Sequence, residues 1–318
     1  MTGAQKQENS GRKNRDFTEV SSIVIPIVKV FLKRETKRAG FLLSPPTYLS
    51  LVFFGKHDKL FTMKEYAEFS RVYDRFMDEI PYGTWCSHIT QLLKNEGIDE
   101  GLLCELGCGT GTMTELLALN GYDMTGIDVS SDMLQEALKK RDQSGLPILY
   151  LQQDMREFEL YGTMRAFISV CDSMNYLLTK EDLITTFKLV NNYLDPGGVF
   201  IFDLKTAYYF REILGDRTEV LEDEDAFCVW ENTFDEEEKI NEYALTIFER
   251  TDSPREDLYE RFEEFHEQRA YEIEEITKWA RDAGMIPERF LDADTMDEVR
   301  DTSERIYVIL REQGKRKI

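Results

Sequence analysis

Residues 102–111 read Leu-Leu-Cys-Glu-Leu-Gly-Cys-Gly-Thr-Gly, and residues 121–128 read Gly-Tyr-Asp-Met-Thr-Gly-Ile-Asp. The first five residues are mostly apolar and form a run short enough for a buried strand. Between the two stretches, Met113, Leu116 and Leu117 share one face of a predicted helix. A strand, a glycine-rich turn, a helix, a second strand and a closing acid make the first half of a nucleotide-binding α/β unit.

The residue types at the turn indicate the kind of ligand. Gly107, Gly109 and Gly111 allow a tight bend and the close approach of a ligand, because they carry no Cβ. Asp128 ends the second strand, where an acid can accept hydrogen bonds from both hydroxyls of a ribose, as in dinucleotide sites. The spacing is Gly-x-Gly-x-Gly, however, and Glu105 stands two residues before the first glycine. A carboxylate there disfavours a pyrophosphate and favours a ligand that carries an ammonium group.

This pattern resembles motif I of the class I S-adenosylmethionine (SAM) methyltransferases. In that family the glycine loop packs against the methionine part of SAM, and the acid after the second strand holds the ribose. An ordinary βαβ unit with an incidental acid is the alternative, and the combination of features disfavours it. The resemblance implies a first set of cofactor-binding residues: Glu105, Gly107, Gly109, Gly111, Asp128 and Val129.

Two further segments extend the resemblance. After a predicted strand at 148–151, Asp154 matches the acid that bonds the adenine amino group, and the backbone of Met155 would meet the ring. An exposed loop aspartate is the alternative for Asp154. Residues 66–74 resemble the N-terminal helix that covers the SAM site, which would bring Tyr73 to the methionine end; alternatively, Tyr73 is a core aromatic residue of an amphipathic helix.

A predicted strand at 165–171 leads into Cys171-Asp172-Ser-Met-Asn-Tyr-Leu. Ligands of open parallel sheets bind beyond the carboxyl ends of the strands, so this loop should border the methyl group. It resembles the motif IV loop of one bacterial methyltransferase subgroup, and we place Cys171 among the cofactor-binding residues. Asp172 is either a general base or substrate anchor, or a carboxylate that holds backbone amides. A nucleophilic Cys171 is disfavoured, because no histidine lies nearby in sequence.

The remaining pattern completes the sheet. A helix at 181–193, a strand at 199–204 and a closing pair at 286–291 and 305–311 predict an α/β fold: a Rossmann-like, seven-stranded methyltransferase sheet with helices on both faces. Residues 218–268 break this rhythm. There, 227–232, 240–251 and 258–266 have strand-like composition and are separated by acidic turns. We expect three antiparallel strands that roof the site; in the subgroup such an insertion helps to form the acceptor pocket.

His266 is the remaining catalytic candidate. The chain has only three histidines, and the ordinary pKa of an imidazole suits a general base that deprotonates an acceptor. A histidine bonded structurally at the end of a strand is the alternative.

Charge divides the chain. The 318 residues carry a formal net charge of −22, which argues against nucleic acid as the main partner. Residues 1–62 hold 11 Lys+Arg and 5 Asp+Glu, a net charge of +6, so the remainder carries −28. We expect an N-terminal extension (1–62) without a catalytic part, a methyltransferase domain (63–312) and a tail (313–318). A membrane-surface or partner-binding arm is the alternative for the extension.

Other classes of site have little support. The five cysteines have neither metal-ligand nor disulfide-framework spacing. No run approaches the roughly 20 apolar residues of a membrane span, and the N-terminus does not read as a secretory signal. The sequence therefore predicts a cytoplasmic protein without metal or stable membrane insertion.

The resemblance implies transfer of a methyl group from SAM to an N, O or C atom of a small-molecule acceptor by in-line SN2 displacement, which mainly requires positioning. Two alternatives stay open: an NAD-dependent oxidoreductase, against which Glu105 and the glycine spacing speak, and a non-catalytic SAM-binding module. The acceptor is not readable from the sequence, and a homodimer is left open.

Overall fold

A computed structural model describes residues 69–77, 80–251 and 258–315 of the 318-residue chain. The chain divides into two compact units, Met1–Leu60 and Phe61–Ile318, and every described residue belongs to the second. The expectations for the extension (1–62), for the first part of the helix at 66–74 and for residues 316–318 of the tail lie outside the described residues.

Among the described residues, seven strands form one sheet, called here the large sheet, in the order β10-β11-β5-β4-β1-β2-β3. Neighbours from β5 to β3 run parallel, whereas β11 runs antiparallel to both β5 and β10. This is the predicted fold class, now confirmed. The strands are β1 (Gly101–Leu106), β2 (Tyr122–Asp128), β3 (Leu149–Gln152), β4 (Met164–Ser169), β5 (Leu194–Lys205), β10 (Met285–Asp292) and β11 (Arg305–Glu312).

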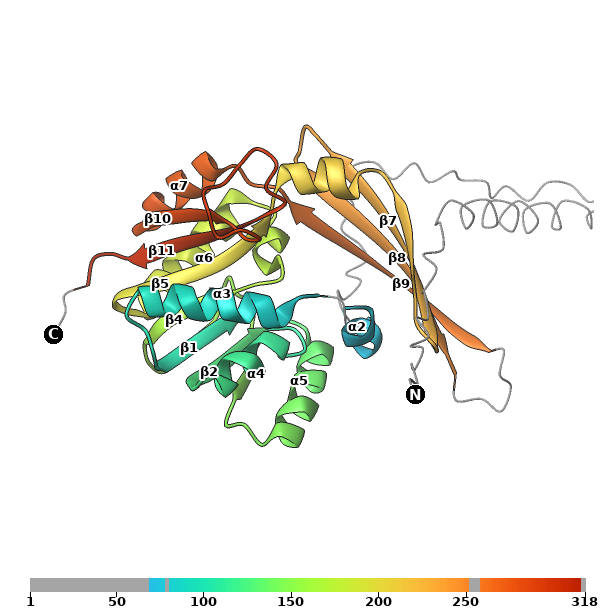
Figure 1. Cartoon of the computed structure of the whole chain (residues 1–318), viewed down its shortest axis with the longest axis horizontal. Helices are drawn as coiled ribbons and strands as arrows, with labels where there is room; N and C mark the ends of the chain where they lie inside the picture. The colour runs from blue at the N-terminus through green and yellow to red at the C-terminus, as the bar shows by residue number, and fades with distance from the viewer. Residues whose placement is uncertain (1–68, 78–79, 252–257, 316–318) are drawn as a thin grey trace, which may run out of the picture. The chain divides into compact units, whose positions relative to one another are not determined.

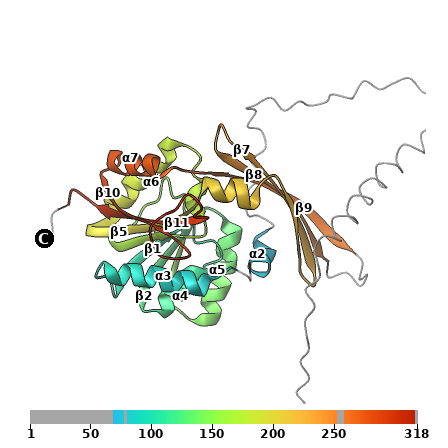
Figure 2. The same ribbon diagram turned by 45° about the horizontal axis from the view of Figure 1, so that its top comes forward.

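Helices cover both faces of the large sheet (Figure 1, Figure 2). On one face lie α3 (Tyr82–Asn95), α4 (Thr112–Leu119) and α5 (Ser131–Ser144); on the other lie α6 (Lys180–Tyr193) and α7 (Ile273–Asp282). Helix α4 is the helix that Met113, Leu116 and Leu117 predicted. Its N-terminal neighbour Gly111 has φ +78°, a conformation that glycine adopts without strain.

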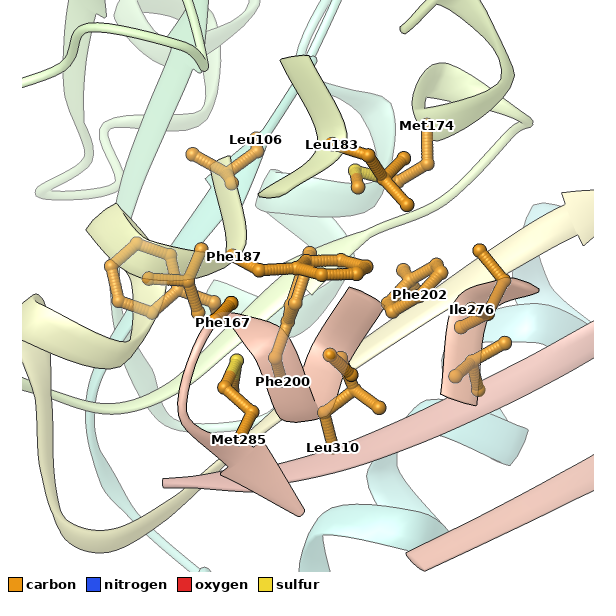
Figure 3. Packing of buried hydrophobic residues seen from close by; sticks show 14 of the residues in the cluster. Leu106, Phe167, Met174, Leu183, Phe187, Phe200, Phe202, Ile276, Met285 and Leu310 are labelled. Atoms are coloured by element: carbon orange, nitrogen blue, oxygen red, sulfur yellow. The ribbon is translucent and has the colours of Figure 1, made fainter. Parts of the chain in front are cut away.

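The alternation of side chains along β5 builds both layers of the core. Phe200 and Phe202 point to the layer under α6 and α7, where they pack with Phe187 (Figure 3). Val199 and Ile201 belong to the layer under α3 and α4. All of these side chains are fully buried. Residues 199–202 of β5 are therefore apolar at every position, as a parallel sheet that is covered on both faces requires.

The segment after β5 forms the second sheet, called here the antiparallel sheet, in the order β6-β7-β8-β9. We expected three strands, and the structure has a fourth, β6 (Thr218–Glu222). Most of its side chains are exposed, so β6 lacks the alternation that marks a half-buried strand. The others are β7 (Ala226–Asp235), β8 (Ile240–Arg250) and β9 (Tyr259–Arg269).

One face of the antiparallel sheet, called here the inner face, is apolar at one end and polar at the other. The apolar end packs in one cluster with Phe69 and Val72, at helix α2 (Ser70–Phe76). Phe210 of the π-helical turn η3 (Tyr209–Leu214) belongs to the same cluster and stacks on Phe234, which pairs with Asn241 at the polar end. Strand pairing puts Asn232 opposite Tyr243 and Tyr243 opposite His266. The inner-face polar residues are Asn232, Asn241, Tyr243, Glu264, His266 and Gln268, all buried.

Candidate active site

The three glycines of the loop after β1 have different surroundings. All have positive φ: 66° at Gly107, 54° at Gly109 and 78° at Gly111. A Cβ on Gly107 would lie 2.6 Å from the Ser173 side chain, and one on Gly111 would collide with the hydroxyl of Tyr150. A Cβ on Gly109 would have no atom beyond its chain neighbours within 4 Å. At Gly107 and Gly111 the missing Cβ therefore leaves room for neighbouring side chains, whereas the surroundings of Gly109 are open.

Asp128 shapes this loop. Its Oδ2 accepts a hydrogen bond from the backbone N–H of Gly109 at 2.7 Å, and its Oδ1 accepts one from Ser130 at 2.8 Å. Burial raises the pKa of Asp128, while these backbone donors act in the opposite direction. The carboxylate is thus fixed at the end of β2, beside the open glycine.

Glu105 is almost fully buried, at 2% exposure, and the hydroxyl of Thr114 donates a hydrogen bond to its Oε2. Burial raises the pKa of Glu105 to about 8. Within the described residues no salt bridge to Glu105 is present. The side chain is therefore mostly protonated at neutral pH, and it contacts α4 through Thr114.

Helix α2 is connected to the glycine loop. Asp74 accepts a hydrogen bond from the hydroxyl of Thr110 at 2.7 Å and forms an ion pair with Lys140 of α5 at 2.6 Å. One residue earlier, the hydroxyl of Tyr73 lies 3.7 Å from the sulfur of Cys171. The structure thus brings Tyr73 and Cys171 together and links the helix that carries Tyr73 to the glycine loop.

A second tyrosine reaches the same sulfur. Tyr82, at the start of α3, donates to Cys171 Sγ at 3.7 Å. Burial raises the pKa of the Cys171 thiol to about 11, so this sulfur is a neutral thiol. Sequence reasoning did not single out Tyr82, because it follows Pro81 at a helix start and belongs to no recognised motif.

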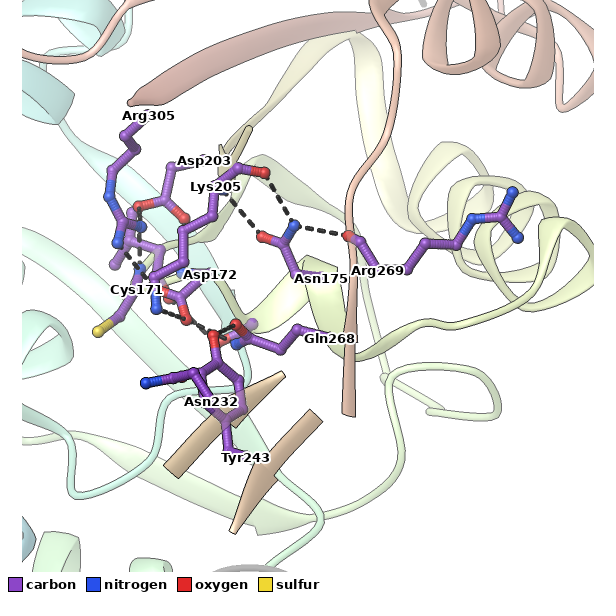
Figure 4. A network of polar contacts seen from close by, with 12 residues as sticks. Cys171, Asp172, Asn175, Asp203, Lys205, Asn232, Tyr243, Gln268, Arg269 and Arg305 are labelled. Atoms are coloured by element: carbon purple, nitrogen blue, oxygen red, sulfur yellow. Dashed lines mark hydrogen bonds and ion pairs between the residues drawn. The ribbon is translucent and has the colours of Figure 1, made fainter. Parts of the chain in front are cut away.

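The turn after β4 holds a strained backbone. Cys171 and Asp172 both have positive φ, 60° and 56°, which costs free energy in residues that carry a Cβ. Asp203 of β5 accepts hydrogen bonds from both backbone N–H groups, at 3.0 and 2.8 Å. Arg305, the first residue of β11, donates to Asp203 at 2.7 Å and to Asp172 at 2.8 Å (Figure 4). Asp203 therefore holds this turn in place.

Asp172 is surrounded by donors. Its carboxylate pairs with Lys205 at 3.1 Å and with Arg305, and Gln268 of β9 donates to it at 2.6 Å. Burial acts to raise the pKa of Asp172, but the two cations and Gln268 outweigh it and hold the pKa well below the usual range. The interpretation in which Asp172 holds backbone amides is wrong, because Asp203 accepts the backbone hydrogen bonds of this turn. A carboxylate with so low a pKa is also a weak general base.

The polar residues after Asp172 join separate elements. Ser173 donates to the carbonyl oxygen of Gly107 at 3.1 Å. Asn175 donates to the carbonyl oxygens of Lys205 and Arg269, at 3.1 and 2.8 Å (Figure 4). This loop therefore ties the glycine loop, the end of β5 and the end of β9 to one another.

His266 lies on the inner face, 3% exposed. Its Nε2 is 3.2 Å from a carboxylate oxygen of Glu264, and its ring meets the ring of Tyr176 edge-on. The hydroxyl of Tyr243 donates to Gln268 Oε1 at 2.5 Å. His266 is thus two residues along β9 from Gln268, the side chain that bonds Asp172.

The remaining predicted positions lie after β2 and β3. Val129 is 60% exposed. Asp154 binds the guanidinium of Arg156 through both oxygens; burial acts to raise its pKa, but these bonds lower it. The Cε of Met155 lies 3.4 Å from where a Cβ on Gly107 would be. Met155 therefore adjoins the glycine loop, whereas the carboxylate of Asp154 already has a partner.

Four residues that matter at this edge escaped sequence reasoning: Asp203, Lys205, Gln268 and Arg305. Two of them had a signal, since Asp203 and Lys205 interrupt an apolar strand at its carboxyl end, where ligands of such sheets bind. Gln268 and Arg305 come from distant segments, and nothing in their own neighbourhoods marks them.

Within the described residues, no group of three or more His, Cys, Asp or Glu side chains is arranged to hold a metal ion. In the same part of the chain, no helix is long and apolar enough to cross a membrane. All five cysteines are free thiols.

Comparisons with known proteins agree with this geometry. Residues 103–198 match a family described as "Methyltransferase domain". A Bacillus subtilis (strain 168) protein named "Putative methyltransferase YqeM" is 36% identical over 243 residues, 76% of this chain and 95% of that protein. A dTDP-3-amino-3,4,6-trideoxy-alpha-D-glucopyranose N,N-dimethyltransferase from Streptomyces venezuelae is 32% identical over 136 residues, 42% of this chain and 54% of that enzyme.

A similar solved structure identifies SAM as the cofactor. A SAM-dependent methyltransferase from Clostridium acetobutylicum ATCC 824 superposes with a TM-score of 0.69 at 29% identity, over 78% of this chain and 99% of that one. Together with the identity to the Bacillus protein over nearly its whole length, this excludes the oxidoreductase alternative. The chain belongs to the SAM-dependent methyltransferases of class I.

Proposed function

We propose that the chain methylates a small molecule that binds between the carboxyl edge of the large sheet and the inner face of the antiparallel sheet. One observation carries the proposal: Gln268 of the inner face bonds Asp172, whose turn adjoins the glycine loop. Cofactor-binding residues and an enclosed polar surface are thereby joined through one buried carboxylate. The acceptor atom is left open among N, O and C.

The residues at this edge suit SAM. Gly109 leaves its surroundings open, and Asp128 beside it offers carboxylate oxygens to ribose hydroxyls. Glu105, close to neutral in the ligand-free protein, becomes a counter-charge when a cation approaches and lowers its pKa. Bound SAM supplies a methyl group made electrophilic by the sulfonium. Tyr73 and Cys171 border the methionine end, and Asp154 and Met155 the adenine end.

Asp172 and His266 have different roles in this proposal. Asp172 joins the turn to the inner face through Gln268. It is not the base, because two cations hold its pKa too low for proton abstraction at neutral pH. His266 is the candidate base, since it lies on the inner face two residues from Gln268 and its Nε2 meets a carboxylate that can stabilise a charged ring.

The finer classification rests on resemblance. The Cys-Asp-Ser-x-Asn-Tyr-Leu loop and the antiparallel insertion point to the bacterial subgroup named above. The methylation of an amino sugar nucleotide by the Streptomyces relative supports a small-molecule acceptor here. We also propose that residues 63–312 form the catalytic domain, with 1–62 as an extension and 313–318 as a tail.

Calorimetry tests cofactor binding. SAM and S-adenosylhomocysteine should bind with dissociation constants in the micromolar range, and NAD should not bind. Turnover is measured with methyl-labelled SAM and a small-molecule cell extract, with Asp128→Ala as the binding-deficient control. The proposal is supported if the parent protein forms labelled product and Asp128→Ala does not. Tight SAM binding without labelled product from any extract would favour a non-catalytic SAM-binding module instead.

A further inference from the structure

Two asparagines of the inner face have amide atoms without hydrogen-bond partners in the described part of the chain. Asn241 is fully buried, and neither its Nδ2 nor its Oδ1 is bonded. Asn232 is 4% exposed; its Oδ1 accepts from the indole N–H of Trp230 at 3.1 Å, but its Nδ2 is unbonded. Buried polar groups are nearly always paired, and an unpaired one destabilises the fold. Stability therefore does not explain these two amides.

Their position relates them to the reaction. Asn241 pairs across the strands with Gln268, which donates to Asp172, the residue next to Cys171. Asn232 pairs with Tyr243, whose hydroxyl donates to the same Gln268. The unbonded amides thus adjoin, on one face, the side chains that reach the cofactor edge.

We propose that Asn232 and Asn241 bind the acceptor, and that they recognise an uncharged hydrogen-bonding group such as a hydroxyl or a carboxamide. This inference rests on the proposed function and names the chemistry of its acceptor. The free atoms comprise two amide donors and one amide acceptor, a set that suits a neutral group able to donate and accept.

The charges nearby favour the same ligand class. Lys205, whose Nζ lies 5.7 Å from the ring centroid of Tyr243, pairs with Asp172. Arg305 pairs with both Asp172 and Asp203. A phosphate or carboxylate at the asparagines would therefore have to break these buried ion pairs to gain a counter-ion. A neutral hydroxyl or amide needs no counter-ion, and the asparagines themselves are neutral.

The asparagines are enclosed in this conformation, so the acceptor enters when the elements covering the inner face move. Helix α2 is one such cover: Phe69 and Val72 share a cluster with Tyr243. Arg75 links α2 to Asp223 and Glu249 of the antiparallel sheet at 3.2 Å, and this arginine is 38% exposed. Exposed ion pairs contribute little stability, so these two contacts oppose an opening of the cover only weakly.

Thermal melting of the protein without acceptor tests whether Asn241 contributes to the stability of the fold. Replacement of an unbonded amide by an apolar side chain of similar size removes an unpaired group, so Asn241→Leu should melt at the parent temperature or about 2–4 °C above it. Asn175→Leu is the matched control: it is equally buried but has bonded amide atoms, and it should melt about 5 °C or more below the parent.

Methyl transfer from labelled SAM into an active extract tests the ligand. Asn241→Leu and Asn232→Leu should lose at least tenfold in transfer while they bind S-adenosylhomocysteine as the parent does. Asn241→Asp should lose a similar factor, because a carboxylate has no N–H group to donate to the acceptor and its charge would be buried without a cation. Faster transfer by Asn241→Asp would show a cationic group there and overturn the proposed chemistry.

Two other results would overturn the inference: a melting temperature of Asn241→Leu well below the parent, or transfer rates of both leucine variants within twofold of the parent. If the parent methylates nothing in any extract, the proposed function fails. The melting comparison then still decides whether Asn241 serves the fold.

Discussion

The carboxyl edge of the large sheet and the inner face of the antiparallel sheet both bury polar groups, but they pair them differently. At the edge, Asp128 and Asp203 accept backbone hydrogen bonds, and Asp172 is matched by two cations and Gln268. On the inner face, the amide of Asn241 has no partner within the described residues. The buried carboxylates of the edge thus have partners within the protein, whereas the inner face keeps hydrogen-bonding capacity that the described part of the fold leaves unused.

The two regions meet where Gln268 bonds Asp172. Arg305 pairs with Asp172 and Asp203 beside this contact, so its loss should have the largest effect. Arg305→Leu leaves the buried carboxylates of Asp172 and Asp203 without their shared cation. We expect the free energy of unfolding to fall by about 3–5 kcal/mol, measured by urea denaturation. Arg141→Leu, which removes an arginine paired only with the exposed neighbour Asp142, should cost less than about 1 kcal/mol.

The double variant Arg305→Leu/Asp203→Asn sharpens this test. It removes the negative charge of Asp203, which Arg305→Leu leaves without a cation, and should recover part of the lost free energy of unfolding. If the free energy of unfolding of Arg305→Leu alone is within about 1 kcal/mol of the parent, this guanidinium does not stabilise the two buried carboxylates.

A pair of glycine substitutions separates packing from ligand access at the edge. Gly107→Ala combines positive φ with a collision at Ser173 and should cost about 2–4 kcal/mol of stability. Gly109→Ala has positive φ but open surroundings and should cost about 1 kcal/mol, while weakening S-adenosylhomocysteine binding in calorimetry. Equal destabilisation by both variants would show that Gly109 also serves packing.

The raised pKa of Glu105 predicts a pH dependence. The folded protein holds the Glu105 proton up to a pKa of about 8, above the ordinary value of 4.5, so this group makes stability fall as pH rises from about 5 to 8. Glu105→Gln should remove at least about 1 kcal/mol of that decline in urea denaturation at pH 5 and pH 8. An unchanged decline in Glu105→Gln would assign it to other groups.

The smallest effect is expected where α2 meets the antiparallel sheet. Arg75→Ala breaks two partly exposed ion pairs, with Asp223 and Glu249, and should lower the free energy of unfolding by about 0.2–1 kcal/mol. Faster hydrogen exchange confined to α2 would accompany it. A loss above about 2 kcal/mol would contradict the view of α2 as a loosely held cover.

The carboxyl edge of the large sheet was predictable because the elements that form it are close together in the sequence. The strand, glycine turn, helix and acid from Leu102 to Asp128 lie within one βαβ unit, and parallel strands bring the loops after β1, β2, β3 and β4 to the same edge. The four-stranded antiparallel sheet was predicted only in part. Strand β6 is held by pairing with β7 and lacks a pattern of its own.

By itself, the sequence determined the fold class, the glycine turn with Asp128, and the membership of a family that uses SAM, since alternating burial and short-range spacing encode all three. Only the tertiary structure decided which carboxylate holds the Cys171–Asp172 turn and which side chains pair with Asp172. It alone showed that two inner-face asparagines have amide atoms without a hydrogen-bond partner among the described residues. The physical reason is sequence separation: Asp172, Gln268 and Arg305 are brought within hydrogen-bonding distance by strand pairing and burial, and such contacts leave no periodic trace along the chain.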